Sequence, residues 1–267
     1  MSASNYFDQL VGIIGGTGPE ATNYFTSLLV KLRGHVGSDQ EHIPFLLLNN
    51  PQIPDRSKHL LFNGESPLPE MVETGLLLKR AGATFLVIPC HTAHVFTEEL
   101  EAGVGLPVMN MIDLTITHLS KAFGKKIKVG LLATDGTLTS NTYKQAIEKI
   151  APSMSLITPS KKYQADVMKA IYKIKKFSAD EQSFNLLNNA ALQLIRDGAS
   201  VIILGCTEIP LALSKEKCNF ELVDPMEILA KSVIERTLMS KKLWNSRFLP
   251  TLPIITSSSG FSNEINI

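Results

Sequence analysis

The sequence predicts an α/β fold of two pseudo-symmetric halves, each a mostly parallel sheet flanked by helices, with a ligand-binding cleft between them. Two observations predict it. Short apolar runs alternate along the chain with segments of helical length, which is typical of βαβ units. The second part of the chain also repeats motifs of the first, and such a repeat indicates a duplicated unit.

The predicted strands are apolar runs of the kind that buried parallel strands require. They cover residues 11–14, 45–48, 84–88, 128–133 and 200–204. The predicted helices lie between them, at 19–33, 67–81, 137–149 and 181–197. This order places a helix after most strands, so neighbouring strands are expected to run parallel.

Two pairs of segments carry the repeat. VGIIGGTG, beginning at Val11, resembles VGLLATDG, beginning at Val129. GATFLVIPCHT aligns without gaps on GASVIILGCTE, at nearly the same separation along the chain. The alignment places Cys90 opposite Cys206. We therefore expect the two cysteines to occupy equivalent positions in the two halves.

The repeat also suggests domain bounds. Residues 1–113 plus 215–240 are expected to form the first domain and residues 114–214 the second. The segment after residue 214 is expected to return a strand and a helix to the first half. Residues 241–267 contain Pro and Ser without clear periodicity and are expected to form a loosely attached tail.

Composition excludes several classes of protein. Of the 267 residues, 44% are apolar and 19% are charged, which is ordinary for a globular protein. The net charge of +1, without a basic run interleaved with aromatic residues, argues against nucleic-acid binding. No apolar stretch of about 18 residues predicts a membrane span. Small polar ligands are the expected partners.

The expected location is the cytoplasm. The first residues, MSASNYFDQL, lack the basic and apolar regions of a secretory signal. The chain has three cysteines that lie far apart, and this number and spacing favour reduced thiols over disulfides.

Cys90 and Cys206 each come directly after a predicted strand and before a predicted helical segment. In open α/β sheets this edge is where ligands bind. A thiol at a helix N-terminus has a lowered pKa, which favours the reactive thiolate. A buried structural cysteine is the alternative for either residue alone, but the matched positions favour function. Cys218 has no counterpart in the first half and is taken as incidental.

Other chemistry is open to the same residues. Cys90, His91 and His94 lie close together, but no further segment completes a zinc site, so no metal is expected. A cysteine nucleophile with a histidine base would suit acyl transfer. That alternative leaves the second cysteine unexplained.

The glycine-rich stretch GGTGPEA follows the first strand, and its GTGPEA portion satisfies the dinucleotide-binding pattern G-x-G-x-x-A. A dehydrogenase is therefore one alternative. The loop's N–H groups would bind a carboxylate as well as a phosphate. The second half has Thr134-Asp135-Gly136-Thr137 in the matching place, which favours a small carboxylate held by both loops.

The loop Asn49-Asn50-Pro51-Gln52-Ile53-Pro54-Asp55-Arg56 follows the second strand on the same edge. Its two prolines stiffen the loop that carries Arg56. The planar guanidinium suits bidentate binding of a carboxylate, and a solvated surface arginine is the alternative.

Together, GGTGPEAT, DQEHIPFLLLNNPQIPDR, PCHTAH, VGLLAT-DGT and GCTEIP resemble the aspartate/glutamate racemase family, and its aspartate racemase branch most closely. The resemblance runs from about Val11 to about Met239. It implies two pseudo-symmetric α/β domains with the active site in the cleft between them, usually in a homodimer. It also implies that neither pyridoxal phosphate nor a metal is needed.

The resemblance places the catalytic cysteines at Cys90 and Cys206. One thiolate removes the α-proton and the opposite thiol returns a proton to the other face, with Cys90 acting on the D-enantiomer and Cys206 on the L-enantiomer. Arg56 and Lys175, or Lys176 if the register differs, correspond to the partners of the side-chain carboxylate. The full set of implied substrate-binding residues is Thr17, Asp55, Arg56, Ser57, His91, Thr92, Ala93, Thr134, Thr137, Lys175, Thr207 and Glu208.

His91 departs from the family pattern, because aspartate racemases usually carry Asn there, in PCNTAH. An imidazole and an amide donate hydrogen bonds differently. The resemblance therefore supports racemase chemistry more firmly than it supports aspartate as the substrate. The expected function is cofactor-independent racemisation of an acidic amino acid, with aspartate foremost. The alternatives are a broad-specificity racemase, another reaction of the superfamily such as maleate isomerisation, and a non-catalytic amino-acid-binding protein.

Overall fold

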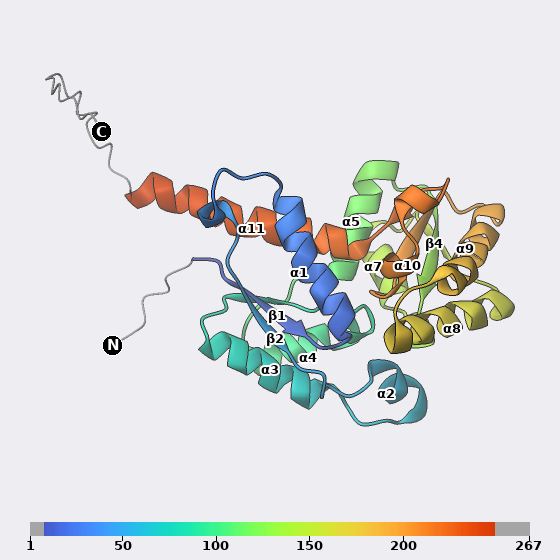
Figure 1. Ribbon diagram of the computed structural model, residues 1–267, viewed down its shortest axis with the longest axis horizontal. Helices are drawn as coiled ribbons and strands as arrows, with labels where there is room; N and C mark the ends of the chain where they lie inside the picture. The colour runs from blue at the N-terminus through green and yellow to red at the C-terminus, as the bar shows by residue number, and fades with distance from the viewer. Residues whose placement is uncertain (1–7, 249–267) are drawn as a thin grey trace, which may run out of the picture.

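The computed structural model describes residues 8–248, which form two α/β domains side by side (Figure 1). The first is built around strand β1 and the second around strand β4. Both sheets are entirely parallel. In the described part of the chain, no helix is long and apolar enough to cross a membrane.

The first sheet has the order β2–β1–β3. Its strands are β1 (Val11–Gly15), β2 (Phe45–Asn49) and β3 (Phe85–Val87). Every residue of β1 is buried, as expected for a central strand covered on both faces. Val11 and Ile13 pack toward one face, and Ile14 packs toward the other. The alternation arises because successive side chains of a strand point in opposite directions.

Helices cover both faces of this sheet. They are α1 (Pro19–Arg33) on one face and α3 (Leu68–Arg80) and α4 (Thr97–Val104) on the other, whereas α2 (Arg56–Phe62) lies against the second domain. Helix α1 begins with a proline at its first position, where the missing N–H is not needed for an intrahelical bond. Short 3-10 helices lie at Asp39–Glu41 and Thr92–Phe96.

The second sheet has the order β5–β4–β6–β7. Its strands are β4 (Lys128–Ala133), β5 (Ser155–Ile157), β6 (Val201–Gly205) and β7 (Leu222–Val223). The helices of this domain are α6 (Asp135–Thr139), α7 (Thr142–Ile150), α8 (Lys161–Phe177), α9 (Glu181–Arg196) and α10 (Ile209–Ala212), with a 3-10 helix at Lys215–Lys217. The central strand β4 has its neighbours in the same arrangement as β1, in agreement with the sequence repeat.

Strand β7 corrects one expectation, because it pairs with β6 in the second sheet and not with a strand of the first. In the first sheet, an isolated parallel bridge between Leu86 and Val108 corresponds to the pairing of β6 with β7. Leu86 and Ile202 are equivalent positions in the repeat, and Ile202 pairs with Leu222. The fourth pairing position of each sheet is therefore filled by residues of the same half. Within residues 8–248, no strand returns from the end of the chain to the first sheet.

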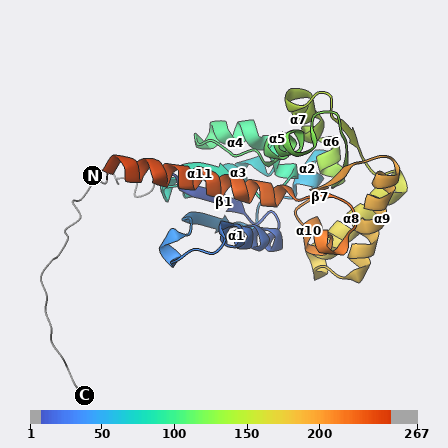
Figure 2. The ribbon, with the colours of Figure 1, turned by 90° about the horizontal axis from the view of Figure 1, so that it is seen from above.

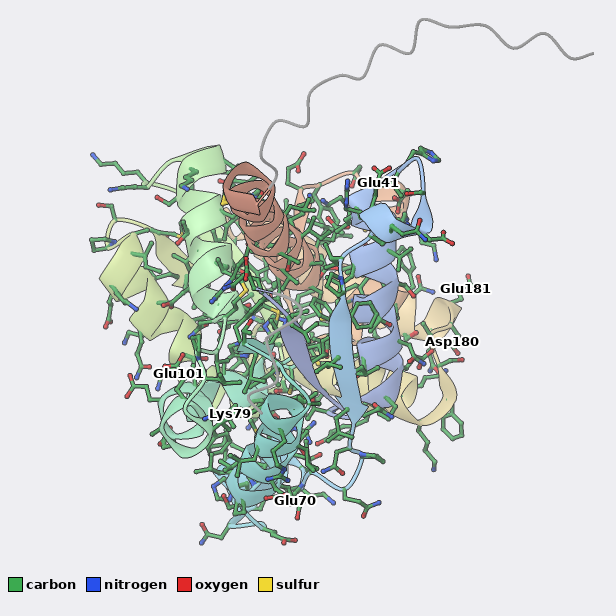
Figure 3. All side chains as sticks on the ribbon, turned by 90° about the vertical axis from the view of Figure 1, so that its left-hand side faces the viewer. Glu41, Glu70, Lys79, Glu101, Asp180 and Glu181 are labelled. Atoms are coloured by element: carbon green, nitrogen blue, oxygen red, sulfur yellow. The ribbon has the colours of Figure 1, made fainter. Side chains whose placement is uncertain are left out.

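Two helices join the domains. Helix α5 (Met111–Phe123) contains the boundary expected after residue 113, and it packs through Ile116 against the core of the second domain. Helix α11 (Pro225–Phe248) starts beside β7 and packs through Leu229 and Val233 on the first domain. Figure 2 shows α11 running along the first domain, and Figure 3 shows it end-on between α1 and α5. The chain thus crosses between the domains twice.

Other expectations differ in detail. The helix expected at 137–149 is divided into α6 and α7 because Asn141 between them has a left-handed φ of 56°. Helix α11 continues to Phe248, so the first part of the expected tail, 241–248, is helical. The remainder, 249–267, lies outside the described residues.

Candidate active site

A small cavity lies where residues that follow the strands of both sheets meet. Its volume is about 20 Å³, enough for roughly one water molecule. The lining residues are Thr17, Asp55, Arg56, Ser57, Cys90, His91, Thr92, Thr134, Lys175, Cys206, Thr207 and Glu208. The domains are therefore closed on each other. Larger hollows exist, including one of about 710 Å³ beside α4 and α7, but neither Cys90 nor Cys206 lines them.

All of the lining residues belong to the set singled out from the sequence. Two members of that set do not line the cavity. Ala93 is fully buried in the apolar core of the first domain, because its side chain points away from the site. Thr137 lies behind Thr134 and is hydrogen-bonded to it. Lys175 lines the cavity and Lys176 does not, and Lys176 lies over the ring of Phe177.

Cys90 and Cys206 are both 6% exposed. The Cys206 thiol donates a hydrogen bond to Glu208 Oε2 at 2.9 Å. Burial, followed by the negative charge of Glu208, raises the pKa of Cys206 well above its usual value, although Lys175 opposes this. The expected lowering is wrong for Cys206, because the helix after it, α10, has only four residues and begins at Ile209.

His94 holds the segment after Cys90 in place. Its Nδ1 lies 2.8 Å from the carbonyl oxygen of Cys90, and its Nε2 accepts a hydrogen bond from the backbone N–H of Met111 at 3.0 Å. Since Nε2 accepts, Nδ1 carries the proton and donates. Burial lowers the pKa of His94, so the ring is neutral. Both nitrogens are occupied, which leaves His94 unsuited to metal binding or to acting as a base for Cys90.

His91 lines the cavity and is 2% exposed. Burial lowers the pKa of His91 to about 3. Its Nδ1 lies 2.9 Å from the hydroxyl oxygen of Tyr143, which belongs to α7 in the second domain. The sequence contains no signal for Tyr143, because only the fold brings α7 against the loop that follows β3.

Three threonine hydroxyls meet across the domain boundary. Thr92 Oγ1, from the first domain, lies 2.9 Å from Thr137 Oγ1 and 3.2 Å from Thr134 Oγ1. Thr134 also caps α6 by accepting a hydrogen bond from the backbone N–H of Thr137, which is a standard N-cap interaction. The hydroxyls can exchange these mutual bonds for bonds to a bound carboxylate.

The two cations of the site differ in surroundings. Arg56 is 7% exposed; its Nη2 donates to the carbonyl of Thr17 at 2.6 Å, and its Nη1 donates to two further backbone carbonyls. Arg56 is thus a fixed interior cation and not a solvated surface residue. The Lys175 side chain is 31% exposed, and its Nζ lies 3.8 Å from Glu208 Oε1.

Asp55 and Ser57, which flank Arg56, have structural contacts. Asp55 caps α2 by accepting a hydrogen bond from the backbone N–H of Lys58. Ser57 lies against Gly136 of the second domain, where an added Cβ would come within 2.6 Å of Ser57 Oγ. The two residues therefore fix the position of Arg56 and the fit between the domains.

Unpartnered polar atoms gather at this cavity. Among the described residues, five buried side-chain polar atoms have no hydrogen-bond partner, and three of them belong to lining residues: Thr17 Oγ1, Arg56 Nε and His91 Nε2. An unsatisfied buried group costs about 1–3 kcal/mol. Such a concentration of unused hydrogen-bonding capacity indicates a site built to receive a polar ligand.

The glycine-rich loop faces an acidic side chain. An added Cβ at Gly18 would lie 2.6 Å from Oε1 of Glu208, which reaches this loop from the second domain. A carboxylate at this position repels a phosphate, so the geometry argues against the dinucleotide-binding alternative. Gly16 has a φ of 89° and lies against the backbone of Asn50, so its glycine serves a tight turn.

Comparison with known proteins agrees with this geometry. The profile of the family described as Asp/Glu/Hydantoin racemase matches residues 14–233. The broad specificity amino-acid racemase RacX of Bacillus subtilis is 24% identical over 234 residues, which cover 86% of this chain and 98% of the relative.

Solved structures have the same fold. The Picrophilus torridus aspartate racemase is 30% identical, with a TM-score of 0.75 over 86% of this chain and 94% of that chain. A putative Asp/Glu racemase from Yersinia pestis is 24% identical, with a TM-score of 0.71 over 86% and 99% of the two chains. Since the family profile spans both cysteine-bearing halves, the chain belongs to the Asp/Glu/hydantoin racemase family.

Proposed function

We propose that this protein racemises an acidic amino acid, with aspartate foremost, by a two-base mechanism in which Cys90 and Cys206 exchange protons with the α-carbon and no cofactor takes part. One observation carries the proposal. The two cysteines, from equivalent positions of a duplicated unit, line one buried cavity together with the cations Arg56 and Lys175. Two thiols suit proton transfer on opposite faces of a carbon, and the cations suit an anionic substrate.

In the direction that starts from the L-enantiomer, Cys206 acts as the base. Glu208 accepts the thiol proton through the hydrogen bond it already makes, which leaves a thiolate. The thiolate takes the α-proton, and the Cys90 thiol then gives its proton to the opposite face. The products are the D-enantiomer, a Cys90 thiolate and a protonated Glu208. The reverse reaction starts from that state, with Cys90 as the base.

The remaining polar groups stabilise the charge that develops on the α-carboxylate. Thr17 has a free buried hydroxyl, and Thr92 and Thr134 also line the cavity. Preorganised donors in a water-excluded site are worth far more than donors in water. Arg56 and Lys175 are assigned to the side-chain carboxylate, which would make the site selective for an acidic substrate.

Deuterium exchange tests the reaction directly. Purified protein is incubated with L-aspartate in deuterated buffer, and NMR follows the α-proton while chiral chromatography measures D-aspartate. We expect exchange together with racemisation. Cys90→Ser and Cys206→Ser should each lower turnover by about 1,000-fold or more, because serine is a far weaker acid. Cys218→Ser is the matched control, since Cys218 is partly exposed and does not line the cavity.

The outcomes separate the alternatives. If either catalytic-site variant keeps wild-type turnover, the two-base mechanism is wrong. The similarity to RacX favours broad specificity as the second candidate, so the same assay is run with glutamate and with neutral and basic amino acids. Conversion of maleate to fumarate would identify another reaction of the superfamily. Tight aspartate binding without α-proton exchange would identify a binding protein.

The family resemblance also supports a homodimer located in the cytoplasm, and a domain boundary near residue 113. Light scattering on the purified full-length chain measures the first of these properties. A mass of twice 29.3 kDa is the expected result, and a monomer at micromolar concentration would contradict it.

A further inference from the structure

His91 and Tyr143 form a buried pair that joins the two domains at the cavity. His91 follows β3 and Cys90, whereas Tyr143 lies on α7 and packs in the core of the second domain. Both side chains are 2% exposed, and their rings stack with centroids 5.9 Å apart. Tyr143 does not line the cavity and His91 does. Since Nδ1 faces Tyr143, the opposite edge of the ring, with Nε2, is the one available to a ligand.

The direction of this hydrogen bond follows from counting unsatisfied groups. If the Tyr143 hydroxyl donates to Nδ1, then Nε2 carries the proton and one buried donor is left without a partner. If Nδ1 donates instead, the Tyr143 hydroxyl proton and the Nε2 lone pair are both left without partners, because Tyr143 Oη makes no other hydrogen bond to the described residues. Each such group is costly, so donation by Tyr143 is favoured.

Both partners keep the protonation state that this arrangement needs. Burial, followed by Asp224 and Cys206, raises the pKa of Tyr143 well above that of an ordinary phenol. Burial keeps His91 neutral. A neutral imidazole whose tautomer is set by its second nitrogen is an established way to present a fixed N–H.

We propose that Tyr143 is a positioning residue that holds His91 as the tautomer whose Nε2–H donates to the substrate's α-carboxylate. The assignment to that carboxylate follows from sequence neighbours, since His91 lies between Cys90, which faces the reacting carbon, and Thr92, whose hydroxyl lies in the lining. This inference rests on the racemase function proposed above. Because the two residues come from different domains, the donor is set correctly only when the domains are closed.

NMR of the ring nitrogens tests the tautomer without any need for turnover. Full-length protein labelled with ¹⁵N is compared with Tyr143→Phe, and the His91 signals are identified by their loss in His91→Asn. We expect Nε2 of His91 to be protonated in the wild type and to lose that preference in Tyr143→Phe. His94 is an internal control, since its contacts fix the opposite tautomer. A proton on Nδ1 of His91 in the wild type would overturn the proposal.

Kinetic measurements show whether Tyr143 positions the His91 ring or acts only through packing. We expect kcat on L-aspartate to fall about 100-fold in His91→Leu, as when one oxyanion donor is removed, and about 5-fold in Tyr143→Phe, which corresponds to one hydrogen bond. In a His91→Asn background, Tyr143→Phe should have little further effect, because an amide has no tautomer to set. An equal loss in both backgrounds would show that Tyr143 acts only through packing.

Two controls keep the outcomes distinct. Tyr172→Phe removes a hydroxyl from a side chain that is 48% exposed and outside the cavity, so it should leave kcat unchanged. If the wild-type protein racemises no amino acid, the proposed function fails, while the NMR comparison still decides which nitrogen of His91 carries the proton.

Discussion

The thiol of Cys206 donates a hydrogen bond to the carboxylate of Glu208 across 2.9 Å, and both side chains are nearly inaccessible to solvent. Lys175 Nζ lies 3.8 Å from the other carboxylate oxygen. The thiol therefore experiences two opposed charges: the carboxylate of Glu208 raises its pKa, whereas the ammonium of Lys175 favours the thiolate. Glu208 raises the pKa of Cys206, and in the proposed mechanism it is also the group that receives the thiol proton.

Replacement of Glu208 by Gln separates these two effects. We expect the pKa of Cys206 to fall, because the negative charge that raises it is gone. We also expect turnover from L-aspartate to fall about 100-fold, because an amide cannot accept the proton and general bases contribute at least that much. Mass spectrometry of iodoacetamide-treated protein across a pH series measures the first effect, and kcat measures the second.

Cys90 serves as the internal control for Glu208→Gln, because it makes no hydrogen bond to Glu208 and its labelling is measured in the same samples. The midpoint of Cys206 alkylation should move to lower pH. A midpoint that moves to higher pH would show that Glu208 does not act on Cys206 through its charge.

The contact between Gly136 and Ser57 predicts an effect on closure. A methyl group at Gly136 would lie 2.6 Å from Ser57 Oγ and 3.0 Å from its Cα, so Gly136→Ala pushes the domains apart. Overpacking of this kind costs about 1–3 kcal/mol, and we expect KM for L-aspartate to rise about 10-fold. Thermal stability should not fall in parallel, because alanine is favoured over glycine inside a helix.

Gly37→Ala is the matched control for Gly136→Ala. An added Cβ at Gly37 would meet only the flexible end of the Glu41 side chain, at 3.1 Å, far from the domain boundary. It should leave KM unchanged. If KM is the same in wild type and Gly136→Ala, the closed arrangement is not the state that binds substrate.

Much of the fold is predictable because its central strands are apolar on both faces. Strand β4 has its predicted bounds, as does helix α1. Strand β5, which was not predicted, has three residues, and β7, whose pairing was wrongly predicted, has two; such short strands create no clear pattern. The many lysines of helix α8 lower its mean hydropathy below that of the predicted helices. Asn141 divides the expected 137–149 helix through a left-handed backbone that the local sequence does not require.

The composition of the candidate site was predictable to a similar degree, since motifs at strand ends identify which residues meet. The pKa shifts of the site residues were not predictable. The lowered pKa expected for Cys206 assumed a helix dipole, whereas burial and Glu208 dominate. The partner of His91 was also inaccessible, because Tyr143 lies 52 residues away along the chain. Such contacts depend on how two domains are docked, which no local pattern encodes.

Buried His91 predicts a specific dependence of stability on pH. Its pKa is about 3 in the folded protein and about 6.5 in an unfolded chain. Between these values the unfolded state binds a proton that the folded state does not, so the free energy of unfolding falls as pH falls. From pH 7 to pH 5 the wild type should lose about 2 kcal/mol more than His91→Asn.

Urea denaturation of both proteins at several pH values measures this difference. Asp224, whose pKa burial raises to about 6, has the opposite effect, since its folded form gains a proton as pH falls. His94 acts in the same direction as His91. Both contributions are common to the two proteins and cancel in the comparison. Parallel pH profiles would mean that His91 takes up a proton in the folded protein near its usual pKa.

Replacement of His94 by alanine should lower stability, because His94 has a structural role and takes no part in the proposed proton transfer. In His94→Ala the carbonyl of Cys90 and the N–H of Met111 both lose their partner, and the deleted ring leaves a cavity beside the hollow that His94 lines. An unsatisfied buried N–H and the deleted ring together should lower the free energy of unfolding by about 3 kcal/mol. Denaturation with urea, followed by circular dichroism, measures it.

The matched substitution for His94→Ala is His35→Ala, because His35 is exposed and surface substitutions usually change stability by less than about 0.5 kcal/mol. Turnover should fall in His94→Ala even where the protein is fully folded, since the segment that carries Cys90 is no longer tied to the start of α5. A stability loss as small as that of His35→Ala would mean that water replaces both hydrogen bonds, and that Cys90 is held by the strand before it.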